Sequence, residues 1–357
     1  MRKGGEGQVS GNHMEEMQPT PPVTSAPEKK ARLGNSQLRI ITGAVYALVL
    51  LAFFVGKVLV HKLFFDALIL IFSICGTYEM IRAFGDKLHK SQKIAAMVFS
   101  QLCVVVYIVA DVIFTDYLNV GFPEDSPLDA VGRNYAPHAA LVVFILGIAV
   151  IFGILVYGHE RMSLESVGYT LIAYLYPSVF LVIMTVCNHL AFYSDAAIAL
   201  VFVVAPLADV FAYTFGRSLG KKFPAKLAPH VSPNKTLVGG FGGLIGGAVG
   251  GLAVFFIYYG LSHCVRLTGI AQFELHAPVF VWQELPFFIG VGVVIAAFSQ
   301  FGDLVESAFK RKLGIKDMGN ILPGHGGVLD RIDSSLYASL IVAFIFVIRI
   351  MITGSPA

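Results

Sequence analysis

Two pairs of acidic residues stand out in a chain that carries few charges. Asp303 and Glu306 are three residues apart, and so are Asp330 and Asp333, so each pair would share one face of a helix. Acids at this spacing repel one another unless a cation or a base lies between them. Carboxylate oxygens are the hard ligands of Mg²⁺, which commonly takes one or two of them together with substrate phosphates. The spacing therefore predicts a magnesium site.

Basic residues and a glycine-rich turn lie between the two acidic pairs. His325 stands in the run Pro-Gly-His-Gly-Gly, where Gly324, Gly326 and Gly327 allow positive φ angles and a close approach of the backbone to a ligand. Alone, the bases would anchor the chain to anionic lipid head groups, and the histidine would be an ordinary loop residue. Together with the acids they predict metal-assisted phosphate chemistry. The basic residues that match a polyphosphate are Lys310, Arg311, Lys312 and Lys316.

A second polar stretch lies further upstream. Asp209 falls inside an apolar run, where a carboxylate costs at least about 2.5–3.5 kcal/mol on membrane-insertion scales. We expect it to be paired or to line a hydrated cavity. Arg217, two helical turns on, is one candidate partner, and a simple position at the helix end in contact with water is the other alternative.

These residues must be positioned by a membrane protein. Hydrophobic residues make up 56% of the 357 residues and charged residues only 14%, against about 25% charged in soluble domains. Apolar runs of about 20 residues are long enough to cross a bilayer, where the backbone must be helical. The prediction is an all-α polytopic integral membrane protein with about nine transmembrane helices. The expected spans lie near 40–60, 63–82, 94–114, 138–157, 166–187, 196–216, 237–259, 287–305 and 335–353.

The distribution of basic residues predicts the orientation. With the N-terminus in the cytoplasm, nearly all Lys and Arg residues fall on the cytoplasmic side, which fits the positive-inside rule with an odd number of spans. We expect residues 1–37 to form a disordered cytoplasmic tail, residues 38–195 to form the N-terminal membrane helices, and residues 196–357 to form the catalytic region. The basic residues left outside are Lys57, Lys62, Arg133, Arg266 and Arg349.

Glycine recurs at every fourth position of the seventh span, at Gly239, Gly243, Gly247 and Gly251. Such a ladder lets two helix backbones approach closely. A phosphate-binding loop is the alternative, but the spacing is helical and no GxxxxGK[ST] is present. The ladder therefore predicts helix packing, and a homodimer through this helix is a further expectation.

The acids, the bases and the glycine-rich turn described above belong to three runs that resemble those of the phosphatidate cytidylyltransferases, also called CDP-diacylglycerol synthases. The upstream run of Gln300, Gly302, Asp303, Glu306 and Ser307 is similar to the family's S-Q-x-G-D-x-x-E-S. A second element, D-x-x-A-Y-x-x-G-R-x-x-G, matches at Asp209, Ala212, Tyr213, Gly216, Arg217 and Gly220. The signature itself matches at Ser307, Phe309, Lys310, Arg311, Lys316, Asp317, Gly319, Leu322, Pro323, His325, Gly326, Gly327, Leu329, Asp330, Arg331, Ile332 and Asp333.

The resemblance implies transfer of CMP from CTP to phosphatidate, which gives CDP-diacylglycerol and pyrophosphate. It implies Mg²⁺ on the metal ligands Asp303, Asp330 and Asp333, with a second cation left open, and no nucleic-acid partner. Lys316 and His325 join these acids as expected catalytic residues. The expected substrate-binding residues are Lys310, Arg311, Arg331, Ser232, Lys235, Thr236, Asp209, Tyr213, Arg217, Gly326 and Gly327.

One position departs from the family pattern. The family commonly has S-P-x-K-T-x-E-G, and Val238 stands here where the glutamate is expected. The departure puts in doubt any role for a carboxylate at this position.

Because CTP is cytosolic, we expect the active site to lie on the cytoplasmic side and the lipid tails to stay in the bilayer. The expected membrane is the plasma membrane of a bacterium, with a eukaryotic internal membrane as the alternative. A CTP-dependent polyprenol kinase and an ion transporter are the rival functions. The first lacks the full H-G-G-x-x-D-R-x-D run, and no inverted repeat typical of the second is visible.

Overall fold

The computed structural model describes residues 35–113, 135–190, 193–268 and 282–353. Within these ranges nine helices are long and apolar enough to cross a membrane. The prediction of an all-α polytopic membrane protein with about nine spans is confirmed. Residues 1–34 of the expected tail lie outside the described residues, and the cytoplasmic N-terminus and the division at residue 195 stay predictions.

Each expected span is one long helix. In hydrocarbon every backbone N–H and C=O must find a partner within the chain, which a helix provides along its whole length. The helices are α1 (Asn35–Leu59), α2 (Leu63–Phe84), α3 (Lys90–Val112), α5 (Ala136–Tyr157), α6 (Leu164–Asn188), α7 (Ser194–Leu219), α8 (Leu237–Thr268), α9 (Leu285–Leu313) and α10 (Leu329–Thr353), with short 3₁₀ turns at Gly85–Lys87 and Trp282–Glu284.

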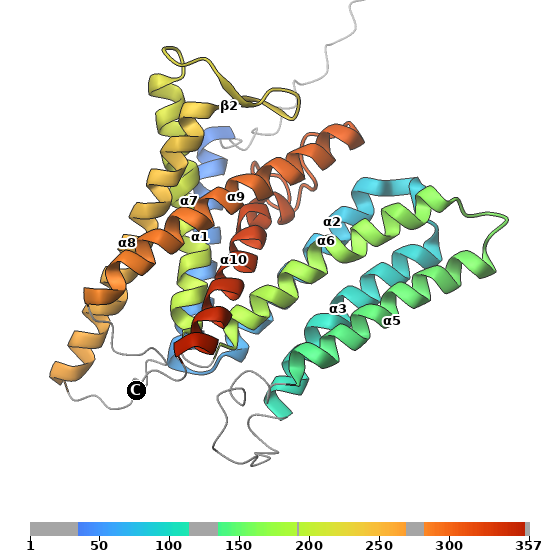
Figure 1. The fold of residues 1–357 in the computed structure, drawn as a ribbon. Coiled ribbons are helices and arrows are strands. Elements are labelled where there is room, and N and C mark those ends of the chain that lie inside the picture. The colour runs from blue at the N-terminus through green and yellow to red at the C-terminus, as the bar shows by residue number, and fades with distance from the viewer. Residues whose placement is uncertain (1–34, 114–134, 191–192, 269–281, 354–357) are drawn as a thin grey trace, which may run out of the picture. The chain divides into compact units, whose positions relative to one another are not determined.

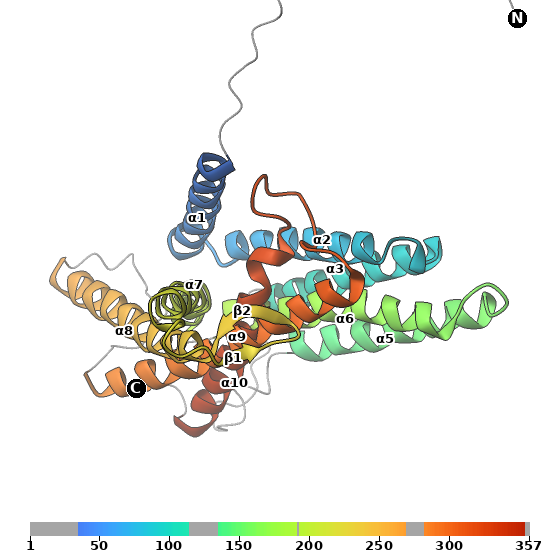
Figure 2. The ribbon, with the colours of Figure 1, turned by 90° about the horizontal axis from the view of Figure 1, so that it is seen from above.

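The helices from α2 onward pack as two groups. Helices α2, α3, α5 and α6 lie side by side, and so do α7, α8, α9 and α10 (Figures 1 and 2). Helix α10 joins the groups because it packs on α6 and α7 as well as on α9. Helix α1 contacts α2, from which only a tight turn separates it, as the sequence predicts.

Several helices are longer than the apolar spans predicted for them, and the extensions of α9 and α10 bear on the site. Helix α9 continues beyond residue 305 to Leu313, and α10 begins at Leu329 instead of near residue 335. The added turns are polar, and Lys310 of α9 pairs both with Glu306 on the same helix and with Asp330 on α10. Helix α9 ends at Gly314, whose φ of 69° lets its N–H bond back to the carbonyl groups of Lys310 and Arg311.

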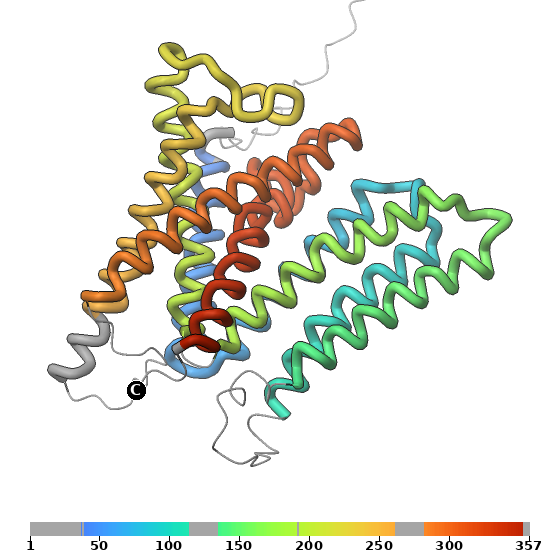
Figure 3. Tube along the Cα trace, viewed as in Figure 1, coloured from blue at the N-terminus to red at the C-terminus, as the bar shows by residue number. Residues whose placement is uncertain are grey.

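A short antiparallel hairpin separates α7 from α8. Its strands are β1 (Lys226–Ala228) and β2 (Ser232–Thr236), with Lys226 opposite Thr236 and Ala228 opposite Ser232. In Figure 3 the chain can be followed from α7 through this hairpin and back into α8. The hairpin therefore brings β2 back to the end of α7 that carries the second polar stretch.

The glycine ladder of α8 packs between two helices of the same chain, which confirms the packing prediction. A Cβ atom added to Gly247 or Gly251 would overlap the backbone of α9 at Gly292 and Phe288. The neighbouring Gly246 faces α7 in the same way. The exposed apolar face of α8 lies elsewhere on the helix, at Phe241, Ile245 and Val249.

Candidate functional site

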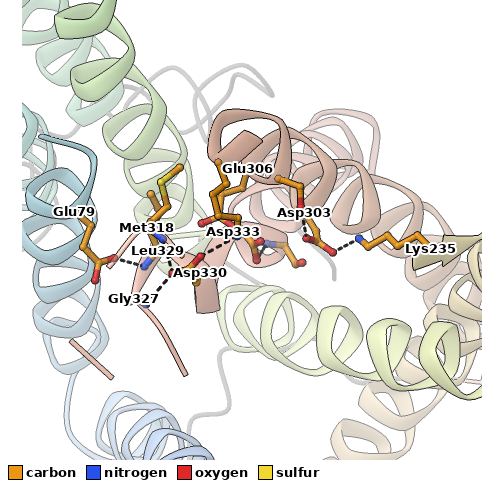
Figure 4. A network of polar contacts seen from close by, with 12 residues as sticks. Glu79, Lys235, Asp303, Glu306, Met318, Gly327, Leu329, Asp330 and Asp333 are labelled. Atoms are coloured by element: carbon orange, nitrogen blue, oxygen red, sulfur yellow. Dashed lines mark hydrogen bonds and ion pairs between the residues drawn. The ribbon is translucent and has the colours of Figure 1, made fainter. Parts of the chain in front are cut away.

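Acidic and basic residues from three elements meet where α9 and α10 approach each other (Figure 4). On α9, Asp303, Glu306 and Lys310 follow one another at helical spacing, as predicted. The Lys310 Nζ lies 2.6 Å from Glu306 Oε2 and 2.8 Å from Asp330 Oδ1 in the first turn of α10. One lysine therefore holds the two helices together at the start of α10.

The other oxygen of Asp330 accepts hydrogen bonds from the backbone. The N–H groups of Met318 and Gly327 donate to Asp330 Oδ2 at 2.9 and 2.8 Å. Both carboxylate oxygens are thus engaged, and the side chain closes the loop between α9 and α10 onto the helix that follows it.

Glu306 and Asp333 form a pair of buried carboxyl groups. Glu306 is fully buried and Asp333 is 7% exposed, and their side chains lie within hydrogen-bond reach of each other. Glu306 Oε1 has no N–H or O–H donor among the described residues. Two carboxyl groups in such a place require a shared proton or a cation.

A pocket of about 420 Å³ opens next to this cluster. It lies between the end of α7, the β1–β2 hairpin, the start of α8 and α9. Six of its lining residues were predicted as site residues: Asp209, Tyr213, Arg217, Lys235, Thr236 and Asp303. Two further polar side chains, Asn234 and Gln300, also face the pocket.

Three acids from three helices converge beside this pocket. Asp209 of α7 lies within electrostatic range of Asp303 on α9 and Asp333 on α10, and the opposing charges are Lys235 and Arg331. The Lys235 ammonium is paired with the Asp303 carboxylate. Asp209 is exposed to the pocket, which fulfils the expectation that it lines a cavity.

The prediction of Arg217 as a partner for Asp209 is wrong. Arg217 donates to the Tyr213 hydroxyl at 3.0 Å, and no ion pair joins Asp209 and Arg217 among the described residues. The two side chains are two turns apart on α7, and Arg217 reaches back only one turn. Its guanidinium is therefore exposed at the rim of the pocket.

The glycine-rich turn has the predicted positive φ angles at Gly324 and Gly326 but not at Gly327. Gly324 and Gly326 take φ angles of 78° and 87°, which side chains disfavour, and Leu322 N–H donates to the Gly326 carbonyl at 2.9 Å. The His325 ring lies beside Gly43 of α1. Burial, with Arg331 and Arg39 nearby, holds the pKa of His325 below its ordinary value, so the ring is neutral near pH 7.

Ten predicted residues are not among those that line the pocket. Six of them belong to the charged cluster or the glycine-rich turn described above, namely Lys310, His325, Gly326, Gly327, Asp330 and Asp333, and four others lie elsewhere. Arg311 is exposed and donates to the Val231 carbonyl of the hairpin at 3.3 Å. Lys316 and Arg331 are exposed, and Ser232 pairs with Ala228 at the far end of β2. They lie around the site rather than in it.

The hydroxyl of Thr236, which lines the pocket, has a structural contact. Its Oγ1 accepts a hydrogen bond from Gly239 N–H at 3.1 Å in the first turn of α8. The threonine thus caps this helix end.

The donor chemistry fits a divalent cation. Asp303, Glu306 and Asp333 offer hard oxygen ligands, and Glu306 Oε1 receives no hydrogen bond from an N–H or O–H group of the described residues. No three His, Cys, Asp or Glu side chains in the described part of the chain lie close enough to hold a metal by themselves. Mg²⁺ usually completes its shell with substrate phosphates and water, so fewer protein ligands suffice.

One buried acid at the site was missed by the sequence reasoning. Glu79 of α2 is fully buried, and its carboxylate accepts hydrogen bonds from Val328 and Leu329 N–H at the start of α10. The available signal was an acid inside a predicted span, close to Arg82. Nothing in the sequence connects it to a loop some 250 residues away.

Known proteins resemble part of this chain. The chain is 43% identical over 136 residues to a phosphatidate cytidylyltransferase of Staphylococcus epidermidis, a match that covers 38% of this chain and 43% of that protein. For the Staphylococcus aureus protein of the same name, identity is 42% over 136 residues, with the same shares. The match thus spans less than half the length of these curated relatives.

The sequence profile of the cytidylyltransferase family matches a much longer part of the chain. It covers residues 38–349, from the first span to the last. The resemblance seen in the sequence is therefore confirmed, and the chain belongs to the cytidylyltransferase family.

Proposed function

We propose that this protein transfers CMP from CTP to phosphatidate and releases pyrophosphate, as the names of its relatives state for those proteins. One observation carries the proposal. Acids from α7, α9 and α10 converge with Lys235 beside a pocket of about 420 Å³. This arrangement suits phosphoryl chemistry, in which charge neutralisation and positioning matter more than a covalent catalyst.

The bonds balance in a single displacement. A phosphate oxygen of phosphatidate attacks the α-phosphorus of CTP and forms the new P–O bond. The bond from that phosphorus to the bridging oxygen of the β-phosphate breaks, and pyrophosphate leaves with the electron pair. Phosphatidate is already an anion near neutral pH, so the site needs no strong general base.

The basic side chains around the pocket would bind the phosphates. Lys235, now paired with Asp303, can exchange this carboxylate for a phosphate oxygen. Arg217 and Arg331 are exposed nearby and offer planar guanidinium groups that match phosphate oxygens. Lys310 is held between Glu306 and Asp330, so we assign it the neutralisation of these acids ahead of substrate contact.

Asp303 and Asp333 are the side chains that would hold Mg²⁺, with Glu306 beside them. When bound, this ion would neutralise charge on the CTP phosphates and on the leaving pyrophosphate. Asp330 belongs to the same set, but its oxygens already hold Lys310 and the loop backbone. We therefore assign Asp330 chiefly to shaping the site, and a second cation stays open.

We place the active site on the cytoplasmic side, because the basic residues gather there and CTP is cytosolic. A bacterial plasma membrane is the location that the staphylococcal relatives favour. The lipid substrate would reach the pocket from the bilayer. A homodimer through α8 would use its exposed apolar face at Phe241, Ile245 and Val249.

The test uses purified full-length protein in detergent with MgCl₂, one lipid at a time, and CTP labelled in parallel reactions at the α-phosphate, which CMP transfer keeps in the lipid product, or at the γ-phosphate, which a kinase would transfer. We expect labelled CDP-diacylglycerol from phosphatidate and no product from undecaprenol or diacylglycerol. Product from undecaprenol alone would identify a polyprenol kinase and overturn the proposal. Replacement of CTP by ATP serves as the nucleotide control.

A further inference from the structure

Glu79 is a buried ionisable residue near the C-terminal end of a predicted membrane span. It lies on α2, one of the helices that contribute no residue to the pocket, and its side chain is fully buried. A buried carboxylate is costly unless it is hydrogen-bonded. Its partners therefore indicate what the residue does.

Both oxygens of Glu79 accept hydrogen bonds from the beginning of α10. Val328 N–H donates to Oε1 at 2.9 Å and Leu329 N–H donates to Oε2 at 2.8 Å. The first N–H groups of a helix have no partner within the helix, and they carry partial positive charge. Glu79 satisfies two of them at once and fixes both the position and the direction of the helix start (Figure 4).

The next residues of the chain are the acids of the site. Asp330 follows Leu329 directly, and Asp333 lies one turn further along α10. Asp330 in turn accepts hydrogen bonds from Gly327 and Met318 N–H. The loop is thus held from two sides, by Glu79 on one and by Asp330 on the other.

Two glycines make room for this contact. A Cβ atom added to Gly319 or to Gly327 would overlap an oxygen of Glu79. Gly327 has no positive φ, so backbone conformation does not explain the need for glycine there. The close approach of the Glu79 carboxylate explains why this position needs glycine.

Other contacts from α1 and α2 reach the same loop. Arg82, one turn from Glu79, donates to the Asn320 side chain at 2.7 Å. On α1, Arg39 donates to the Gly324 carbonyl at 3.1 Å, and Thr42 donates to the Pro323 carbonyl at 3.0 Å. Arg39 and Arg82 are exposed and Thr42 is half-buried, so Glu79 is the only fully buried member of the set among the described residues.

We propose that Glu79 is a positioning residue for the reaction, which sets the 318–329 loop and the first turn of α10 so that Asp330 meets Lys310 and Asp333 meets Glu306 beside the pocket. The proposal rests on the proposed function for its kinetic consequence. The positioning of the loop by Glu79 does not rest on the proposed function, since the contact between α2 and α10 does not depend on which substrate binds.

The first test is backbone hydrogen exchange of the detergent-purified protein without substrate. Glu79→Gln keeps the side-chain volume but presents one amide N–H₂ group to backbone donors, so it cannot accept both bonds. We expect faster exchange in peptides that cover residues 318–329. Thr77→Val is the matched control, because Thr77 is fully buried on the same helix and has no hydrogen-bond partner for its hydroxyl among the described residues.

The second test is the kinetic one. Displacement of catalytic groups by about 1 Å can cost on the order of a hundredfold in rate, so we expect Glu79→Gln to lower kcat/KM by about 10- to 100-fold. The Mg²⁺ concentration for half-maximal rate should rise, Glu79→Asp should restore part of the loss, and Thr77→Val should match wild type.

The outcomes separate the two proposals. Wild-type exchange in the Glu79→Gln loop would overturn the positioning role, and so would wild-type kcat/KM and Mg²⁺ dependence in a folded variant. If wild-type protein makes no CDP-diacylglycerol, the proposed function fails, while the exchange data still decide the role of Glu79.

Discussion

Two clusters of charged residues lie near opposite ends of α2, and they are built differently. The helix-end cluster consists of Lys57, Lys62, Asp66, Asp111, His189 and Asp195. The site cluster consists of Asp209, Lys235, Asp303, Glu306, Lys310, Asp330, Arg331 and Asp333. Asp66 is in the first turn of α2, and Glu79, which supports the site cluster, lies 13 residues later, which is about 20 Å along a helix.

In the helix-end cluster each acid has basic partners. His189 lies 2.8 Å from Asp66 and 2.5 Å from Asp111, through its two ring nitrogens. Lys62 pairs with Asp111 and Lys57 with Asp195, both at 2.6 Å. With His189 protonated, the three acids and three bases of this cluster balance.

The site cluster has more acids than bases. Its five carboxyl groups face Lys235, Lys310 and Arg331, and Glu306 Oε1 has no donor among the described residues. The different balance of acids and bases indicates what each cluster is suited to do. A balanced, buried set joins helices, whereas an excess of acid beside a pocket suits a cation and the phosphates that come with it.

The largest expected effect is on catalysis, from Asp303→Asn. The change removes a carboxylate at the pocket without changing its size, and loss of one such electrostatic contribution costs on the order of 10²–10³ in rate. We expect kcat to fall by about a hundredfold or more in the labelled-CTP assay, with little change in Tm. Near wild-type kcat would show that Asp303 is not needed for the chemistry.

The control for this variant is Glu165→Gln, which makes the same chemical change at an exposed acid of α6. It should keep wild-type kcat.

The second effect is on stability, from Asp195→Asn in the helix-end cluster. The Lys57 and Asp195 side chains are only 2% and 6% exposed, so the variant leaves a buried ammonium without its counter-ion, at a cost of about 3–5 kcal/mol. We expect a clear fall in Tm in detergent, with kcat per folded molecule unchanged.

The double variant Lys57→Met with Asp195→Asn sharpens this result. Replacement of a whole buried pair by neutral side chains is often close to neutral, so most of the lost Tm should return. A double variant as unstable as the single one would mean that the ion pair itself, rather than the orphaned charge, stabilises the helices.

The third effect is a pH dependence of stability through His189. Burial lowers the pKa of His189, but the hydrogen bonds to Asp111 and Asp66 outweigh burial and leave the pKa above its ordinary value of 6.5. A raised folded-state pKa adds stability that is complete below 6.5 and is lost as the pH rises through the folded-state pKa.

The measurement is Tm in detergent between pH 6 and pH 9, for wild type and for His189→Gln. We expect the Tm advantage of wild type over the variant to shrink by a few degrees as the pH rises. An advantage that stays constant or grows with pH would contradict the protonated histidine.

The smallest expected effect comes from Val238→Glu, which adds the acid that the family pattern has at this position. Val238 is half-buried in the first turn of α8, where a carboxylate is favourable by about 0.3–1 kcal/mol. We expect a small rise in Tm and a change in kcat of less than about threefold. A tenfold gain in kcat would instead show that the site lacks an acid.

Much of the fold could be predicted from the sequence, because it depends on local properties. Apolar runs of membrane-spanning length determine the helices in a solvent without water, and a spacing of three residues places Asp303 near Glu306 on any helix. The φ angles of Gly324 and Gly326 likewise follow from a turn that only glycine adopts easily. The extra turns of α9 and α10 could not be predicted from hydropathy, because ion pairs of Lys310, one within α9 and one from α9 to α10, stabilise them.

The partners of the site residues were decided only by the tertiary structure. The sequence offered Arg217 for Asp209 and the phosphates for Lys310, whereas packing joins Lys235 to Asp303 and Lys310 to Glu306 and Asp330. Glu79 shows the reason most clearly. Its two hydrogen bonds go to backbone N–H groups about 250 residues away, and every residue has such a group, so no residue type or spacing marks the partner. Only the packing of α2 near the start of α10 determines which N–H groups Glu79 binds.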